Sequence, residues 1–300
     1  MENARVSVGS ANEAHSASGS VHSTLFLPEE PRIRIRASRA WQSVDLRDVW
    51  ADRELFYFLV WRDLKVRYKQ TLLGASWVIL QPMLLTLIFV VFLGIIVRVP
   101  TEHVPYPLFL YAALLIWTFF SNAIVSGSYS LVVNASMITK VHFPRVIVPA
   151  AAVAVRLFDF LIASLILFVL IIYYGIHPTW GLLMMPLLVV HLTLLATAIG
   201  LWLSALNVKY RDVGTVIPVL LQLWMFVSPI IYPASLVPPR WRAIYDLNPL
   251  AGIIENFRAA LFGLTFSYGS LITSAAITLA LLIYSGYFFR RMEDEFADVV

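Results

Sequence analysis

Long apolar segments, separated by short polar ones, make up most of the chain from residue 75 onward. A membrane-spanning helix needs about 20 mostly apolar residues. Five segments reach that length, namely 75–97, 107–133, 146–174, 180–206 and 213–232, and a sixth, 271–289, is slightly shorter but uncharged. The pattern therefore predicts an all-α, polytopic membrane protein whose six transmembrane helices form one domain over residues 75–290.

A further apolar segment, 250–266, lies between the fifth and sixth predicted spans. It is interrupted by Glu255, Arg258 and two glycines. It is also short for a span, and its charged groups would be costly at the centre of a bilayer. We therefore expect a re-entrant or interfacial element before the last span.

The front of the chain is polar. Residues 1–45 are rich in Ser, Ala, Asn and Glu and lack the apolar run of a signal peptide, which predicts a disordered cytoplasmic tail. Residues 46–74 are predicted to form an amphipathic segment that lies along the membrane lipids, because aromatic and basic residues follow separate stripes of a helix from Leu46 to Gln70. The main residues of this interfacial helix are Trp61, Arg62, Lys65 and Lys69.

Positive charge sets the expected orientation, since cytoplasmic loops carry an excess of Lys and Arg. If the N-terminus is cytoplasmic, 17 of the 22 basic residues lie on that side, 4 lie outside and Arg156 lies within a span. Both termini are therefore expected in the cytoplasm, with residues 291–300 as a short C-terminal tail.

The composition argues against several other classes of protein. The chain is 60% hydrophobic and 13% charged, against roughly half and a quarter in soluble domains. It has no cysteine for a disulfide or a thiolate site. None of its 13 glycines is followed by lysine, so the phosphate-binding loop of an ATPase is missing. We expect no cofactor, no metal site, no nucleic-acid partner and no enzymatic activity of the chain itself.

Two ionisable residues, Arg156 and Asp159, fall inside the third predicted span, three positions apart on one helix face. Such groups are costly in a membrane and often functional. One interpretation is a structural ion pair near the cytoplasmic end of the helix. The other is a proton relay, but that would need further acids in the spans, and none is present. His191, in the fourth span, is interpreted as a hydrogen-bonded packing residue.

Several aromatic residues lie deep within the predicted spans, namely Tyr111, Trp117, Phe119 and Trp224. Aromatic residues usually form the interfacial belts of membrane helices. These four lie deeper than a belt, and an aromatic lining suits a sugar polymer because a ring can stack on the apolar face of a sugar. Both readings, packing and a substrate pathway, stay open from the sequence.

Two short basic segments, NASMITKVHFPRVIVP and LNVKYRDVG, follow the second and fourth predicted spans. Positive-inside topology alone accounts for their charge. In the first segment, however, Pro144 fixes its own backbone and restricts Phe143. Such a stiff loop is suited to docking a soluble partner, and Phe143 would offer an apolar anchor of the kind that dominates interface energies.

Several strings resemble the bacterial ABC type-2 permeases that export polysaccharides. They are WRDLKVRYKQTLLGASWVILQPM, ITKVHFPRVIVP, LNVKYRDV, PIIYPASLVP and NPLAGIIENFRAALFG, in the order of that family. The resemblance covers roughly residues 55–290. Permeases for O-antigen, capsule and teichoic-acid polymers share these strings. The long polar tail departs from the shortest members of the family.

The resemblance implies a homodimer of this chain in the bacterial inner membrane, bound to two copies of a cytoplasmic ABC ATPase. It implies that the dimer moves a lipid-linked glycan outward. The implied ATPase-coupling residues are Lys140, Phe143, Pro144 and Arg145, together with Lys209 and Arg211. Two alternatives remain: the same fold could export a teichoic acid or a small lipophilic compound, or the chain could be a membrane glycosyltransferase.

Overall fold

The computed structural model describes residues 50–69, 76–101, 104–141, 143–177 and 179–293. Every regular element in these ranges is a helix and none is a strand, so the predicted all-α class is confirmed. The predicted tail over residues 1–45 lies outside the described residues, as do residues 294–300 of the predicted C-terminal tail.

Among the residues that the structure describes, five helical segments are long and apolar enough to cross a membrane, which confirms a polytopic membrane protein. They are α3 (Ser76–Phe89) with its π-helical continuation η1 (Val90–Val97), α4 (Tyr106–Val133), α6 (Ile147–Tyr173), the 3-10 turn η2 (Trp180–Met184) with α7 (Met185–Lys209), and α11 (Tyr268–Glu293). Four of them match predicted spans closely. The fifth, α11, extends the predicted sixth span at both ends.

The predicted fifth span is shorter than expected. Its helix, α8 (Val213–Val227), has 15 residues. At about 1.5 Å per residue this helix is about 22 Å long, less than the about 30 Å of a bilayer core. The backbone leaves the helical conformation and becomes extended at Ser228, and Pro229 follows. The apolar residues after Val227 therefore do not continue the helix, and the count of six spans stays a prediction.

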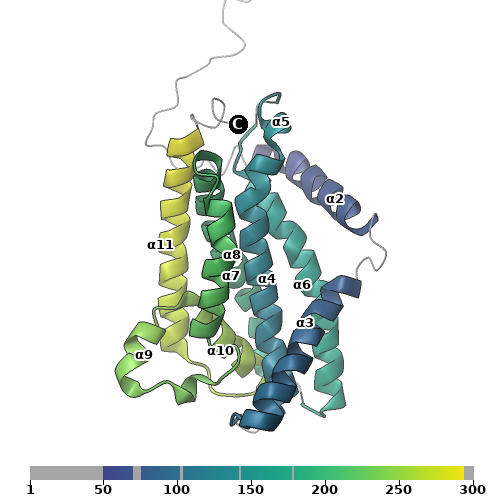
Figure 1. The fold of residues 1–300 in the computed structure, drawn as a ribbon, viewed down its shortest axis with the longest axis vertical. Helices are drawn as coiled ribbons and strands as arrows, with labels where there is room; N and C mark the ends of the chain where they lie inside the picture. Colours follow the sequence, from purple (N-terminus) through teal and green to yellow (C-terminus); the bar gives the residue numbers. More distant parts are fainter. Residues whose placement is uncertain (1–49, 70–75, 102–103, 142, 178, 294–300) are drawn as a thin grey trace, which may run out of the picture. The chain divides into compact units, whose positions relative to one another are not determined.

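Helix α4 is the centre of the bundle and is buried along most of its length. It packs against α3, α6, α7, α8 and α10 (Pro249–Phe262), and Figure 1 shows it between α6 on one side and α7 with α8 on the other. Close approach to α7 depends on glycine. A Cβ atom added to Gly127 would lie 3.2 Å from the Cα atom of Gly200.

One end of the bundle carries α2 (Arg53–Lys69) and the short helix α5 (Ala135–Ile138), near the end of α11 (Figure 1). Helix α2 packs on α6 through the buried residues Leu59 and Val60. Trp61, one residue further, is exposed. The face of α2 that packs on the bundle is thus formed by aliphatic residues, while the Trp61 side chain lies exposed.

The other end carries the short helices η3 (Ala234–Leu236) and α9 (Pro239–Tyr245), together with α10 (Figure 1). Asn248 caps α10 by accepting a hydrogen bond from the amide of Leu250 at 3.1 Å. Gly263 ends the helix in the left-handed conformation, with a φ of 69°. The segment expected to be re-entrant is therefore a buried helix of 14 residues, too short to span.

Candidate functional site

A cluster of charged groups joins α2 to the bundle. Asp159 in α6 accepts hydrogen bonds from Tyr68 Oη at 2.5 Å and from Arg156 Nη1 at 3.4 Å, and it forms an ion pair with Arg67 at 2.9 Å. Arg156 also donates to Ser126 Oγ in α4 at 2.7 Å. The structure thus brings the predicted pair Arg156 and Asp159 together and adds two residues of α2 that the sequence did not indicate.

Burial raises the pKa of the Tyr68 hydroxyl above its usual range. The hydroxyl therefore stays protonated at neutral pH and acts as a donor to Asp159. With three donors on one carboxylate, the negative charge is well compensated although Asp159 is largely buried. This cluster holds the C-terminal part of α2 on α6.

The middle of α2 is held by a second contact. Arg62 Nη2 donates to Asn134 Oδ1 at 2.7 Å, just after α4, and lies 2.8 Å from Asp63. The ammonium group of Lys65 lies 5.0 Å from the centre of the Trp61 ring, as in a cation–π contact. Lys69 is exposed at the end of the helix. Of the predicted interfacial residues, Arg62 therefore binds the bundle, while the other three lie on the accessible side.

The segment predicted to couple to a partner lies between α5 and α6. Phe143 is only 9% exposed and belongs to a buried cluster with Ile147, Val208 and Phe289. It anchors the segment to the chain itself, so it does not offer the exposed apolar anchor that the sequence suggested. Lys140 is exposed, and Val141 is 54% exposed. Lys140 and Val141 are therefore among the exposed residues in the described part of this segment, and Pro144 and Arg145 are partly exposed.

The residue after Pro144 connects this segment to the last helix. The backbone amide of Arg145 donates to Glu293 Oε1 at 3.3 Å, and its guanidinium donates to the backbone carbonyl of Glu293. Arg290 adds an ion pair of 3.1 Å to Glu293. The predicted coupling segment and the end of α11 are thus bonded to each other.

The predicted residues Lys209 and Arg211 are exposed where α7 ends and α8 begins. The bend between the two helices depends on Asn207, which sequence reasoning did not single out. Asn207 Nδ2 donates to the carbonyl of Ser128 at 3.1 Å, and its Oδ1 accepts from the amide of Gly214 at 3.0 Å. Its side chain is buried, so it satisfies backbone groups that water does not reach.

The four aromatic residues considered for a substrate pathway pack within the chain. Tyr111, Trp117 and Phe119 are buried in the main core, and Tyr111 Oη donates to the carbonyl of Ala163 at 2.9 Å. Trp224 is partly buried, and its Nε1 donates to Asn248 Oδ1 at 3.0 Å. These contacts account for the four residues as packing groups, and their assignment to a pathway stays a prediction.

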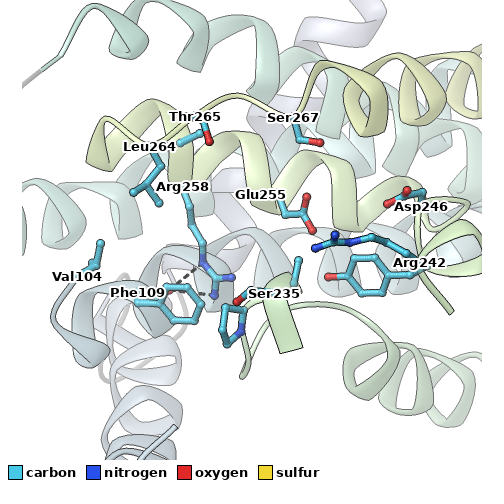
Figure 2. A pocket seen from close by; sticks show the side chains of 14 residues that line it. Val104, Phe109, Ser235, Arg242, Asp246, Glu255, Arg258, Leu264, Thr265 and Ser267 are labelled. Atoms are coloured by element: carbon cyan, nitrogen blue, oxygen red, sulfur yellow. Dashed lines mark hydrogen bonds between the residues drawn. The ribbon is translucent and has the colours of Figure 1, made fainter. Parts of the chain in front are cut away.

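A pocket of about 480 Å³ opens at the end of the bundle that carries α9 and α10 (Figure 2). Arg258, on one side of it, is 4% exposed and lies 3.4 Å from the centre of the Phe109 ring. Its guanidinium donates to the carbonyls of Phe109, Pro229 and Ile230 at 2.7 to 3.2 Å. Arg258 therefore ties α10 to α4 and to the turn after α8.

The other side of the pocket carries Glu255 on α10 and Arg242 on α9, whose side chains point toward each other in Figure 2. Tyr245 and Asp246 line the same side. Burial raises the pKa of the Glu255 carboxyl group above its usual range, and it raises that of the Tyr245 hydroxyl as well. The sequence did not predict that these charged and polar groups lie together. Arg242 and Tyr245 belong to a segment without hydrophobic periodicity, so no pattern placed them near Glu255.

No catalytic arrangement is evident in the part of the chain that the structure describes. No three His, Asp or Glu side chains there lie close enough together to hold a metal ion. His191 Nε2 lies 3.0 Å from Thr278 Oγ1 and 3.3 Å from Ser274 Oγ, so the ring bridges α7 and α11. What the geometry offers instead is an accessible segment between α5 and α6 at one end, a polar pocket at the other, and helices bonded to both.

Comparison with known proteins gives a family match and several relatives whose names agree with it. The sequence profile described as ABC-2 type transporter matches residues 54–262. An O-antigen export system permease protein, RfbA of Myxococcus xanthus, is 29% identical over 259 residues, which cover 85% of this chain and 98% of the relative. The O-antigen export system permease protein RfbA of Klebsiella pneumoniae is 27% identical over 253 residues, which cover 82% of this chain and 95% of the relative. The polysialic acid transport protein KpsM of Escherichia coli is 25% identical over 243 residues, which cover 74% of this chain and 89% of the relative.

Proposed function

Because this chain belongs to the family of ABC-2 type transporters, we propose that it is the permease subunit of an ATP-driven exporter of a lipid-linked polysaccharide. One observation carries the proposal. Relatives named for O-antigen export and for polysialic acid transport are matched over nearly their whole length. Cargo of this class is therefore favoured over a teichoic acid, over a small lipophilic compound and over a glycosyltransferase reaction.

The energy for export comes from a partner in this proposal. The chain lacks the glycine-rich loop and lysine that hold the phosphates of ATP. Two cytoplasmic ABC ATPase subunits would therefore bind a homodimer of this chain in the bacterial inner membrane. The end with α2, α5 and the last turn of α11 would face the cytoplasm, as the 17 basic residues on that side favour.

Coupling to the ATPase would use the segment between α5 and α6. Lys140 and Val141 are accessible to a partner, and Phe143 holds the segment in the chain's own core. Movement of the segment would reach α11 directly, because Arg145 is bonded to Glu293 in its last turn. Packed secondary elements of this kind transmit small displacements over long distances.

The same helix contacts the pocket end of the bundle. Ser274 Oγ in α11 donates to the carbonyl of Pro249 at 2.6 Å, and Gly252 in α10 lies against the backbone of Ser270. Helix α11 would therefore link the ATPase-facing segment with α10, near the side on which the glycan leaves.

Helix α2 would lie at the headgroups of the cytoplasmic leaflet. Its accessible residues Trp61, Lys65 and Lys69 combine an aromatic ring with positive charge, the combination found at lipid interfaces. The cluster around Asp159 would keep the helix in this position while the lipid carrier passes.

Deletion of the chromosomal copy in the source bacterium tests the proposed function. We expect surface polysaccharide to disappear and lipid-linked glycan to build up inside the cell. An unmodified copy of the chain should restore the surface polysaccharide and remove the internal build-up. Surface polysaccharide that persists at its normal level in the deletion strain would overturn the proposal.

A further inference from the structure

We propose that the pocket between α9 and α10 is a binding site for a sugar residue of the exported glycan. Its central groups are Arg242, Tyr245 and Glu255. This inference rests on the proposed function, since it supposes that a glycan passes this end of the bundle. It assigns a contact point for the cargo that lies apart from the aromatic residues buried in the spans.

The pocket has the size and shape of a ligand site. Its volume of about 480 Å³ falls within the range of roughly 300 to 1,000 Å³ that is common for small-molecule sites. Side chains reach it from separate parts of the chain: α4, the segment around η3, α9, α10 and the loop before α11. Figure 2 shows these groups around one open space.

Two buried polar atoms at this site form no hydrogen bond of normal geometry among the described residues. They are Tyr245 Oη and Glu255 Oε1, which lie close enough to interact with each other. Tyr245 is only 8% exposed, so its hydroxyl is largely shielded from bulk solvent. Most buried polar groups in folded proteins are hydrogen-bonded, and an exception needs a reason. A ligand that supplies hydroxyl groups would satisfy both atoms after a small shift of the side chains.

The charges of the lining favour a neutral, hydroxyl-rich ligand. Two cationic residues, Arg242 and Arg258, face two acidic ones, Asp246 and Glu255. The donors of Arg258 are already engaged by backbone carbonyls, so Arg242 is the available cation. A sugar hydroxyl can donate to a carboxylate and accept from a guanidinium at the same time, as this lining requires.

Other ligand classes fit the lining less well. A free phosphate group would find one available cation, Arg242, and would have to lie beside the carboxyl groups of Asp246 and Glu255. An acyl chain would leave the polar groups of the lining desolvated without partners. Phe109 and Leu264 add apolar surface that suits the C–H face of a sugar ring. A sugar has both hydroxyl groups and an apolar ring face, so it can contact both the polar and the apolar side chains of the pocket.

Photo-crosslinking in living cells tests this directly. A benzophenone amino acid is placed at Ser235, which is exposed and lines the pocket, or at its neighbour Leu236, which is exposed and does not line it. The probe is the cell's own exported glycan, detected on the purified chain by periodate staining of its diols. We expect crosslinked glycan at Ser235 and at least fivefold less at Leu236. Equal labelling at the two positions, or none at Ser235 while export continues, overturns the inference.

A second variant separates ligand binding from a structural role. Tyr245→Phe removes only the hydroxyl, and Tyr268→Phe removes an exposed hydroxyl outside the pocket as a control. We expect Tyr245→Phe to reduce the crosslinked glycan about fivefold, the loss typical of one hydrogen bond, while the folded protein stays as heat-resistant as the wild type. Unchanged crosslinking in Tyr245→Phe would mean that the hydroxyl contacts no ligand, which contradicts the inference.

The outcomes also separate this inference from the proposed function. If wild-type cells export polysaccharide but Ser235 labels no glycan, only the pocket assignment fails. If deletion of the chain leaves surface polysaccharide unchanged, the proposed function fails, and the sugar site fails with it.

Discussion

Arg67 in α2 and Asp159 in α6 form an ion pair of 2.9 Å, which joins α2 to a helix long enough to span a membrane. Tyr68 and Arg156 bind the same carboxylate. Asp159 is therefore the common acceptor for groups from two helices, and its loss should affect more than the local pair with Arg156.

Asp159→Asn should lower the free energy of unfolding by about 2 kcal/mol, because Arg67 and Arg156 then lack their counter-charge in a partly buried place. Arg67→Gln should cost less, about 1 kcal/mol, since Arg67 is more exposed and Asp159 keeps two donors. The folded fraction after heating in detergent, measured by gel filtration, gives the comparison. Equal stability of both variants and the wild type would contradict a clamping role for Asp159.

The combined variant Arg156→Gln with Asp159→Asn tests how local the pair is. If the two residues only neutralised each other, the double variant would recover the stability that Asp159→Asn loses. We expect incomplete recovery, because Arg67 stays without its counter-charge and one amide oxygen replaces the two carboxylate oxygens that Arg67 and Tyr68 bind. The same heating measurement decides this. A double variant that is fully stable but exports nothing would instead assign the pair a role in transport.

Substitutions of Phe143 and Val141 should have different effects, the first on folding and the second on docking of the ATPase. Phe143→Ala removes a buried ring and should lower the free energy of unfolding by about 3 kcal/mol. Val141→Asp changes an exposed residue, so the chain should fold normally but retain several-fold less ATPase on purification of the complex. Normal ATPase recovery with Val141→Asp would exclude this surface as the docking site.

Gly252 should not tolerate a side chain. A Cβ atom there would lie 2.5 Å from the backbone oxygen of Ser270, which cannot move without shifting α11. Gly252→Ala should therefore lower the free energy of unfolding by about 2 kcal/mol. Gly269→Ala is the matched control, because open space surrounds that position, and it should be neutral or slightly stabilising. If both variants melt together, the close packing of α10 on α11 is not needed for stability.

Arg258→Lys should be harmful although it keeps the charge. An ammonium group cannot reproduce the planar fork that bonds three carbonyls and stacks on Phe109. We expect a loss of about 3 kcal/mol, since buried carbonyls are left without donors. The yield of folded protein from membranes and its melting temperature measure this. A lysine variant with wild-type values would show that the fork geometry is dispensable.

Hydropathy alone predicted most of the membrane helices, because burial in lipid demands long apolar runs whatever their neighbours are. It overestimated α8 for the same reason. Ile230 and Ile231 continue the apolar run after Val227, although the chain has turned at Ser228 and Pro229. The hydropathy of a residue indicates whether its side chain is buried or in lipid, but it does not indicate where the backbone leaves the helix.

The candidate sites were predictable only where they depend on local spacing. Arg156 and Asp159 meet because residues three apart share a helix face. The partners Arg67 and Tyr68 depend on how α2 packs on α6, which no local pattern encodes. Likewise, the sequence indicated an apolar anchor at Phe143, but whether that ring faces a partner or the chain's own core follows from tertiary packing.

Transport in purified inside-out vesicles tests the central claim most directly. Vesicles that contain this chain and its partner ATPase receive lipid-linked polysaccharide on the outside, and the amount protected from an added glycan-degrading enzyme is followed over time. The account predicts that protected polysaccharide accumulates with ATP, and neither with a non-hydrolysable analogue nor in vesicles that lack this chain. Equal protection without the chain, or no protection while the bound ATPase hydrolyses ATP, would contradict it.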